Sequence, residues 1–317
     1  MKSLTRREVL RGALAVASLV AMRPGVRAAP AALPATAAGT LRIGADLTVN
    51  RMGFGAMRIT GPGIWGEPKD AAEARRVLRR AVELGVDFID TADAYGPDVS
   101  ERLIAEALYP YPPGLVIATK GGQVRPGPNE WVRDGRPAHL RAACEGSLKR
   151  LKLERIDLYQ LHRIDPNVPV ADSLGELAKM QHEGKIRHIG LSQVSAAELA
   201  QARRIVPIVS VQNRYNLADR SSAEVLAVCE SERLAFIPWA PIAAGQADKL
   251  ESGTDSAALA AVARAHGVSV YQAAIAWLLA KSPVMLPIPG TSSVAHLDED
   301  VAAAGIRLTA AELRSLG

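Results

Sequence analysis

Short apolar runs alternate along this chain with segments of helical period. The runs have the length and the β-branched composition of buried strands, at residues 53–57, 86–91, 115–119, 156–161, 186–191, 208–212, 235–239 and 284–288. Apolar residues recur every three or four positions between them, which predicts helices at residues 71–84, 100–108, 140–151, 170–184, 195–205, 221–232, 256–265 and 270–281. Eight strands that alternate with helices predict an α/β fold, a (β/α)8 TIM barrel.

Local signals support these boundaries. Ser195 precedes a helical segment and Glu198 follows three residues later, which predicts a capping box. Gly184 predicts a helix stop before the fifth strand. Residues 41–54 can form a hairpin that closes the bottom of the barrel. No GxGxxG pattern opens a helix, which argues against a doubly wound dinucleotide fold.

Charge is concentrated at the N-terminus. Of 38 basic and 33 acidic residues, six basic and one acidic lie in residues 1–28, which leaves 32 of each in the remainder. A formally neutral body without a basic patch argues against nucleic acid as a partner.

The first 28 residues have the order of an export signal. Arg6-Arg7 lies in a basic stretch, an apolar run follows at residues 12–22, and Val26-Arg27-Ala28 ends on a small residue. The basic stretch resembles the twin-arginine motif, so we expect the twin-arginine translocase as a partner of the precursor. A chance Arg-Arg in a disordered tail is the alternative. The apolar run is too short to span a bilayer, and no cysteine follows it, so no stable membrane anchor is expected.

These features predict three segments and a location. Residues 1–28 are the signal, the Ala- and Pro-rich residues 29–40 are a flexible linker, and residues 41–317 are the barrel. The mature protein is then periplasmic or extracellular, or cytoplasmic if the signal is not used.

The chain has two cysteines, Cys144 and Cys229, and both lie in helical segments. We expect buried free thiols, while an exported location keeps a disulfide open. No cysteine and histidine spacing indicates a metal site.

Four proton-handling side chains stand at or just after the ends of apolar runs: Asp90, Tyr95, Lys120 and His162. In a parallel barrel the chemistry collects at the carboxyl ends of the strands. Reduction of a carbonyl needs a hydride donor and an acid for the developing negative charge. A lysine ammonium lowers the pKa of a nearby tyrosine, a carboxylate holds the lysine, and a histidine can orient the carbonyl oxygen.

The motifs that carry these residues are DTADAYG, ATKGG and YQLHR, and with them the chain resembles the aldo-keto reductase superfamily over residues 41–317. The resemblance implies a catalytic tetrad of Asp90, Tyr95, Lys120 and His162. It also implies a cofactor site on the later strands, made of Ser192, Gln193, Gln212, Trp239, Ala240, Pro241, Ile242, Gly290, Thr291, Ser292, Ser293, His296 and Asp300. Within that set Ser192 and Gln193 bind the carboxamide, and Trp239 stacks on the nicotinamide.

Two departures from the family's pattern concern the cofactor. The carboxamide pair is usually Ser-Asn, whereas this chain has Gln193. Relatives that hold the 2′-phosphate of NADPH often carry Lys and Arg where Ser293 and His296 stand, and Asp300 replaces the usual Asn. The resemblance favours NADP(H), and these residues keep NAD(H) open. The hydroxyls, His296 and the backbone N–H groups of the helix that begins near Ser293 could still hold a phosphate.

The residues and the resemblance together predict an NAD(P)H-dependent reductase of an aldehyde or ketone, in which Tyr95 donates the proton. The alternative is a cofactor-carrying barrel that senses redox state or binds a partner with little turnover. A lyase or isomerase barrel would leave Ser192, Gln212 and Trp239 unexplained. Trp65 and Trp131 follow strand ends and either line the pocket or anchor loops. The sequence identifies neither the small carbonyl substrate nor the oligomeric state.

Overall fold

Seven parallel strands form one continuous sheet in this computed structural model, which describes residues 34–242 and 256–317. The order is β11-β10-β9-β8-β5-β4-β3, with bounds β3 Phe54–Gly55, β4 Phe88–Asp90, β5 Val116–Gly121, β8 Ile156–Leu161, β9 Ile186–Ser192, β10 Ser210–Gln212 and β11 Ala235–Phe236. All six residues of β5 are buried. Strands that are covered on both sides are apolar throughout, which is why the sequence shows runs rather than alternation.

An eighth segment, residues 284–289, closes the sheet into a barrel. Phe236 donates its N–H to the Val284 carbonyl at 2.9 Å, and Gly55 donates to the Pro289 carbonyl at 3.0 Å, so the segment joins β11 to β3. It is not a regular strand, because Pro287 and Pro289 have no N–H to donate. The (β/α)8 barrel expected from the sequence is therefore the fold.

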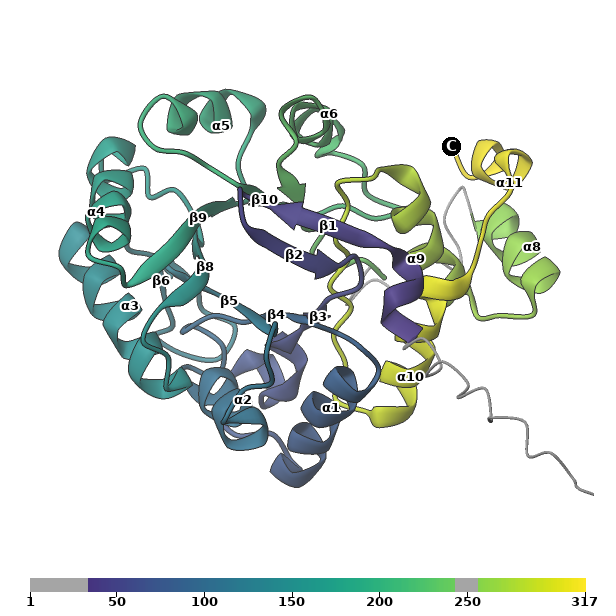
Figure 1. Ribbon diagram of the computed structural model, residues 1–317, viewed down its shortest axis with the longest axis horizontal. Coiled ribbons are helices and arrows are strands. Elements are labelled where there is room, and N and C mark those ends of the chain that lie inside the picture. Colours follow the sequence, from purple (N-terminus) through teal and green to yellow (C-terminus); the bar gives the residue numbers. More distant parts are fainter. Residues whose placement is uncertain (1–33, 243–255) are drawn as a thin grey trace, which may run out of the picture. The chain divides into compact units, whose positions relative to one another are not determined.

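The helices lie outside the strands (Figure 1). Their bounds are α1 Ala71–Glu83, α2 Val99–Leu108, α3 Pro137–Leu151, α4 Val170–His182, α5 Ala196–Arg203, α6 Ala223–Glu232, α8 Ser256–His266, α9 Val270–Lys281, α10 Val294–Ala302 and α11 Ala310–Ser315. The capping box at Ser195 and Glu198 is present at the start of α5. Gly184 follows α4 with a φ of 79°, the left-handed conformation that favours glycine. Both signals are therefore confirmed.

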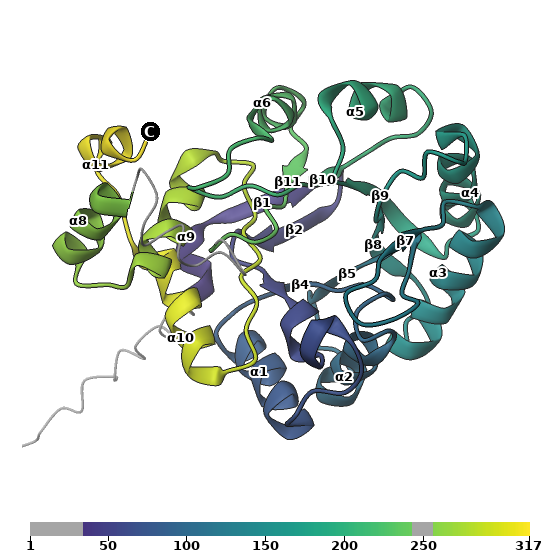
Figure 2. The same ribbon diagram turned by 180° about the vertical axis from the view of Figure 1, so that it is seen from behind.

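The expected hairpin consists of β1 Thr40–Ile43 and β2 Leu47–Asn50, which pair antiparallel. Its apolar residues pack in the same core as Ile156 and Ile186, the first residues of β8 and β9. Asp46 in its turn pairs with Arg187 at 2.6 Å. The hairpin thus covers the amino ends of the strands, and it crosses the near side of the barrel in Figure 1 and the far side in Figure 2.

The described fold begins before the expected boundary at Leu41. Pro34–Ala38 form a 3-10 helix, and Ala35 is fully buried in a core cluster that contains Leu84. The N–H of Ala35 also donates to the Leu84 carbonyl at 3.0 Å. Residues 34–40 are therefore part of the folded unit and not a flexible linker. The expected signal, residues 1–28, lies outside the described residues.

Two small strands, β6 Gln123–Val124 and β7 Val132–Arg133, pair antiparallel in the loop after β5. Cys144 and Cys229 are buried free thiols, as expected. In the described part of the chain, no helix has the length and apolarity to cross a membrane. The same residues contain no cluster of three or more His, Cys, Asp or Glu side chains suited to a metal ion.

Candidate active site

The four expected catalytic side chains come together at the carboxyl ends of neighbouring strands. Asp90 ends β4, Tyr95 lies in the turn after it, Lys120 is near the end of β5, and His162 follows β8. All four are buried, and Lys120 is fully inaccessible. Asp90, Tyr95 and His162 line a cavity of about 430 Å³, called here the inner cavity, with Lys120 directly behind it.

The Lys120 ammonium uses all three of its protons. It donates to Asp90 Oδ2 at 2.6 Å, to the Thr91 carbonyl at 2.8 Å and to the Tyr95 hydroxyl oxygen at 3.3 Å. Burial lowers the pKa of Lys120, but the charges of Asp90 and Tyr95 outweigh burial, and the net pKa lies above the ordinary value. Lys120 is therefore a fixed cation beside the tyrosine oxygen.

Asp90 is held at its second oxygen as well. Gln160 Nε2 donates to Asp90 Oδ1 at 3.0 Å, and Gln212 Nε2 donates to the same atom at 2.7 Å. Gln212 was expected to bind cofactor; it lines the inner cavity and also orients this carboxylate. Gln160 was missed in the sequence, although it stands two residues before His162 and therefore points to the same side of β8.

Tyr95 differs from the expectation in its net pKa. Burial raises the pKa, the Lys120 ammonium lowers it, and Asp90 raises it again, so that the pKa lies above the ordinary tyrosine value. The lysine acts in the expected direction, but desolvation of the phenolate is larger. Tyr95 is consequently a protonated phenol at neutral pH.

His162 is a neutral imidazole. Burial, followed by the charges of Lys120, Arg163 and Arg125, lowers its pKa well below the ordinary value. Its Nδ1 is buried and has no hydrogen-bond partner among the described residues. A neutral imidazole carries one proton, and with no acceptor at Nδ1 that proton belongs on Nε2, where it can be donated to a ligand.

Trp131 forms a wall of the inner cavity next to the catalytic residues. Its ring centroid lies 6.4 Å from that of Tyr95 and 6.1 Å from that of His162, edge to face in both cases. Arg125 stacks on Trp131 at 3.8 Å and lies 5.8 Å from the Trp65 ring. Of the two tryptophans expected to line the pocket or to anchor loops, Trp131 lines the inner cavity, whereas Trp65 packs against Arg125.

Most of the expected cofactor residues line the inner cavity together with the tetrad: Ser192, Gln193, Gln212, Trp239, Ala240, Pro241, Ile242 and Gly290. The Gln193 side-chain oxygen accepts from the Arg214 N–H at 2.6 Å and from the Trp239 indole N–H. Gln193 has a φ of 53°, a region in which Asn is more frequent than Gln. With the oxygen engaged, its NH₂ group remains as a donor for a ligand.

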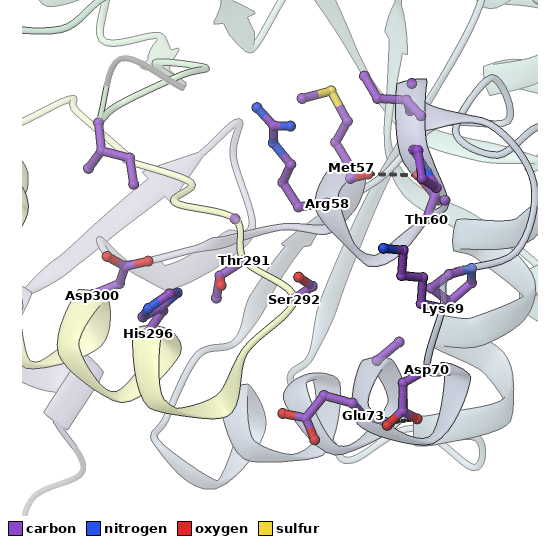
Figure 3. Close-up of a pocket in the computed structure, with 18 of the residues that line it drawn as sticks. Met57, Arg58, Thr60, Lys69, Asp70, Glu73, Thr291, Ser292, His296 and Asp300 are labelled. Atoms are coloured by element: carbon purple, nitrogen blue, oxygen red, sulfur yellow. Dashed lines mark hydrogen bonds between the residues drawn. The ribbon is translucent and has the colours of Figure 1, made fainter. Parts of the chain in front are cut away.

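A second, outer cavity of about 730 Å³ adjoins the first, and Met57, Arg58, Ile64, Ile242 and Gly290 line both. Thr291, Ser292, His296 and Asp300 line the outer cavity along α10 and the segment before it (Figure 3). Arg58, in the 3-10 helix Ala56–Ile59, and Lys69, just before α1, also line it. Neither cation is predicted from the sequence, because both lie far along the chain from α10.

Ser293 does not line either cavity. It precedes α10, and its N–H donates to Thr291 Oγ1 at 3.1 Å. The next N–H, that of Val294, donates to Glu73 Oε1 at 3.2 Å. Two of the backbone donors expected for a phosphate are thus engaged within the protein, and the side chains around the outer cavity are left for that role.

The two cavities fit an extended dinucleotide. They meet at Gly290, where a Cβ would lie 2.3 Å from the Gly55 carbonyl oxygen, so only glycine allows this close approach. The inner cavity offers the indole of Trp239 and the amides of Gln193 and Gln212, which suit a planar carboxamide-bearing ring. The outer cavity offers hydroxyls and the cations Arg58 and Lys69, which suit phosphates, and the carboxylates of Asp70, Glu73, Glu299 and Asp300 also line it.

A (β/α)8 barrel with a buried Asp-Lys-Tyr group beside two adjoining cavities is typical of a nicotinamide-dependent oxidoreductase of the aldo/keto reductase type. The family model for the Aldo/keto reductase family matches residues 51–316, and the chain belongs to this family.

Particular relatives agree with this class. The chain is 54% identical over 282 residues to an uncharacterized oxidoreductase of Schizosaccharomyces pombe, covering 89% of this chain and 90% of the relative. It is 42% identical over 275 residues to pyridoxine 4-dehydrogenase of Escherichia coli, covering 85% and 94%. An aldo-keto reductase of Klebsiella pneumoniae, solved in complex with NADPH, is similar with a TM-score of 0.73 at 27% identity, covering 87% of this chain and 93% of that one. The protein is therefore an NAD(P)H-dependent oxidoreductase.

Proposed function

We propose that this protein reduces an aldehyde or ketone to an alcohol, with the hydride from NADPH and the proton from Tyr95. The observation that carries the proposal is the Lys120 ammonium, which contacts both the Asp90 carboxylate and the Tyr95 hydroxyl at the cavity wall. That arrangement keeps a protonated phenol beside a cation that can stabilise the phenolate after the proton has left.

The proton transfer is favourable although the pKa of Tyr95 is raised. An alkoxide is a much stronger base than a phenolate, so a carbonyl oxygen that accepts negative charge takes the proton from Tyr95. The phenolate that remains lies 3.3 Å from the Lys120 ammonium. A protonated tyrosine at neutral pH favours the direction of reduction, in which the residue acts as an acid.

His162 orients the substrate. With its proton on Nε2, the neutral ring can donate a hydrogen bond to the same carbonyl oxygen that faces Tyr95. Two donors on one oxygen fix the carbonyl plane and polarise the bond. Trp131 covers the adjacent side of the inner cavity and excludes water.

The bound nicotinamide supplies the hydride. Trp239, Ser192 and Gln193 would hold the ring, and Arg58, Lys69 and the hydroxyls of the outer cavity would hold the phosphates. NADP(H) is the favoured form, and the NADPH-bound relative supports this choice. NAD(H) is the alternative, because Asp300 adds a carboxylate to the outer cavity.

Turnover with a panel of carbonyls tests the proposal. Pyridoxal belongs in the panel, because a relative at 42% identity is a pyridoxine 4-dehydrogenase. We expect loss of the NADPH absorbance to match formation of the alcohol in a one-to-one ratio. Tight NADPH binding without reduction of any aldehyde or ketone would instead favour the cofactor-carrying barrel with little turnover.

We further propose that the precursor is exported by the twin-arginine translocase and acts in the periplasm. Arg6-Arg7 and the apolar residues 12–22 support this proposal. Replacement of both arginines by lysine should keep the precursor in the cytoplasm at full length. Unchanged processing and location in a cell fractionation experiment would refute the export route.

A further inference from the structure

The inner cavity contains a guanidinium that neither the fold nor the proposed hydride and proton transfers use. Arg163 directly follows His162, is half-buried, and lines the inner cavity. Within residues 34–242 and 256–317, no carboxylate or carbonyl accepts a hydrogen bond from its side chain. Burial and the nearby charge of Arg133 lower its pKa, and Tyr95 opposes them; the Arg163 charge in turn lowers the pKa of His162.

The neighbouring arginines show what a structural role looks like in this region. Arg125 donates to the carbonyls of Gly63, Ile64, Ala94 and Glu130, so the backbone stabilises its charge. Arg133 donates to the Ile164 carbonyl. Arg163 holds no loop in this way, although burial makes its charge costly and so lowers its pKa.

The other charges of the inner cavity do not satisfy Arg163. The Asp90 carboxylate is saturated by Lys120, Gln160 and Gln212. Arg58 is a second cation, but it lines both cavities and is accounted for by the phosphates of the dinucleotide. Arg163 lines the inner cavity alone, as do Tyr95 and His162. An anion bound there would lie close to the reacting carbonyl.

We propose that the substrate is a carbonyl compound with an anionic group, a carboxylate or a phosphate, and that Arg163 binds this group. The proposal rests on the proposed carbonyl reduction and names its substrate class. A guanidinium forms two parallel hydrogen bonds to either oxyanion, which neutral aldehydes cannot accept. Arg163 is then a specificity residue that binds substrate away from the reacting atoms.

Matched substrates test the proposal. The carboxylate pair is 4-carboxybenzaldehyde against 4-methylbenzaldehyde, and the phosphate pair is pyridoxal 5′-phosphate against pyridoxal. Loss of a charge-assisted contact in Arg163→Gln should raise KM for the anionic member by about 10- to 100-fold while kcat changes little. The neutral members should be unaffected, and the pair that responds more strongly identifies the anion.

Two variants separate this role from a structural one. Arg163→Lys keeps the charge but loses the fork, so we expect a smaller rise in KM. Arg133→Gln removes the adjacent guanidinium and should leave both substrate pairs unchanged. A fall in kcat/KM that is equal for anionic and neutral substrates would overturn the proposal.

A binding measurement decides the question even without turnover. The product analogue 4-carboxybenzyl alcohol should quench tryptophan fluorescence of the wild-type protein, with affinity weakened by about 10-fold or more in Arg163→Gln. Equal affinity in both proteins would refute anion binding by Arg163.

The failure of this inference can be told apart from the failure of the proposed function. If 4-methylbenzaldehyde is reduced normally while Arg163→Gln does not change the preference for anionic over neutral substrates, this inference fails and the proposed function stands. If no carbonyl is reduced, the proposed function fails.

Discussion

Asp300 is a buried carboxylate whose replacement by asparagine should stabilise the protein above neutral pH. It lies on α10, is 6% exposed, and lines the outer cavity. Burial, with a smaller contribution from the Glu299 charge, raises its pKa from 3.8 to about 7. No donor among the described residues contacts its side chain. The folded state therefore prefers the protonated form.

The size of the effect follows from that pKa. Because the folded-state pKa of Asp300 lies above the unfolded value, the contribution of its protonated form to stability is fully present below pH 3.8 and is lost as the pH rises through about 7. Each unit of difference corresponds to about 1.4 kcal/mol, so the loss is on the order of 4 kcal/mol at most. An asparagine side chain at this position does not titrate. The difference in unfolding free energy between Asp300→Asn and wild type should grow from near zero at acidic pH to roughly 2–4 kcal/mol above neutral pH.

Urea unfolding of both proteins at several pH values measures this difference. Asp298→Asn is the matched control, because it removes an exposed carboxylate from the same helix, where an ion pair with Arg80 contributes less than about 1 kcal/mol. A stabilisation by Asp300→Asn that is absent, or that is equal at acidic and alkaline pH, would refute the argument.

Titration with NADPH gives a second readout. The affinity of the wild-type protein for NADPH should fall relative to that of the variant as Asp300 ionises, because the carboxylate repels the phosphates.

Two further substitutions probe the packing of the site. Lys120→Met leaves Asp90 buried without its cation and should lower the free energy of unfolding, measured with urea, by about 3–5 kcal/mol. Adding Asp90→Asn to the same chain should recover part of that loss. No recovery would contradict a stabilising role of the ion pair. Gly290→Ala places a Cβ 2.3 Å from the Gly55 carbonyl oxygen and should lower both stability and NADPH affinity, whereas Gly305→Ala, with no neighbouring atom within 4 Å, should change neither.

The sequence predicted the barrel because parallel strands are covered on both sides and appear as apolar runs. The positions of Asp90, Lys120 and His162 at strand ends followed from those runs. The last strand was expected at 284–288, and only the structure shows that Pro287 and Pro289 make it irregular. Residues 34–40 were assigned to a linker because an Ala- and Pro-rich composition does not show that Ala35 is buried against Leu84.

Effects that depend on burial and on distant contacts were not readable from the sequence. The net rise in the pKa of Tyr95 reflects desolvation, whereas a motif shows only that a lysine is available to oppose it. Gln160 supports Asp90 across 70 positions of the chain. The resemblance places Ser293 at the phosphate site, but Ser293 does not line the outer cavity. Arg58 and Lys69 line it from the segment between β3 and α1, which is adjacent to α10 in the barrel but far from it along the chain.

The most direct test of the account compares Tyr95→Phe with wild type in a single turnover with bound NADPH and 4-methylbenzaldehyde. The phenyl ring keeps the contacts with Trp131 and His162 and removes only the hydroxyl that lies 3.3 Å from the Lys120 ammonium. We predict NADPH affinity within about 3-fold of wild type and a rate of hydride transfer lower by about 10²- to 10⁴-fold. An unchanged rate would remove Tyr95 from the mechanism and contradict its assignment as the proton donor.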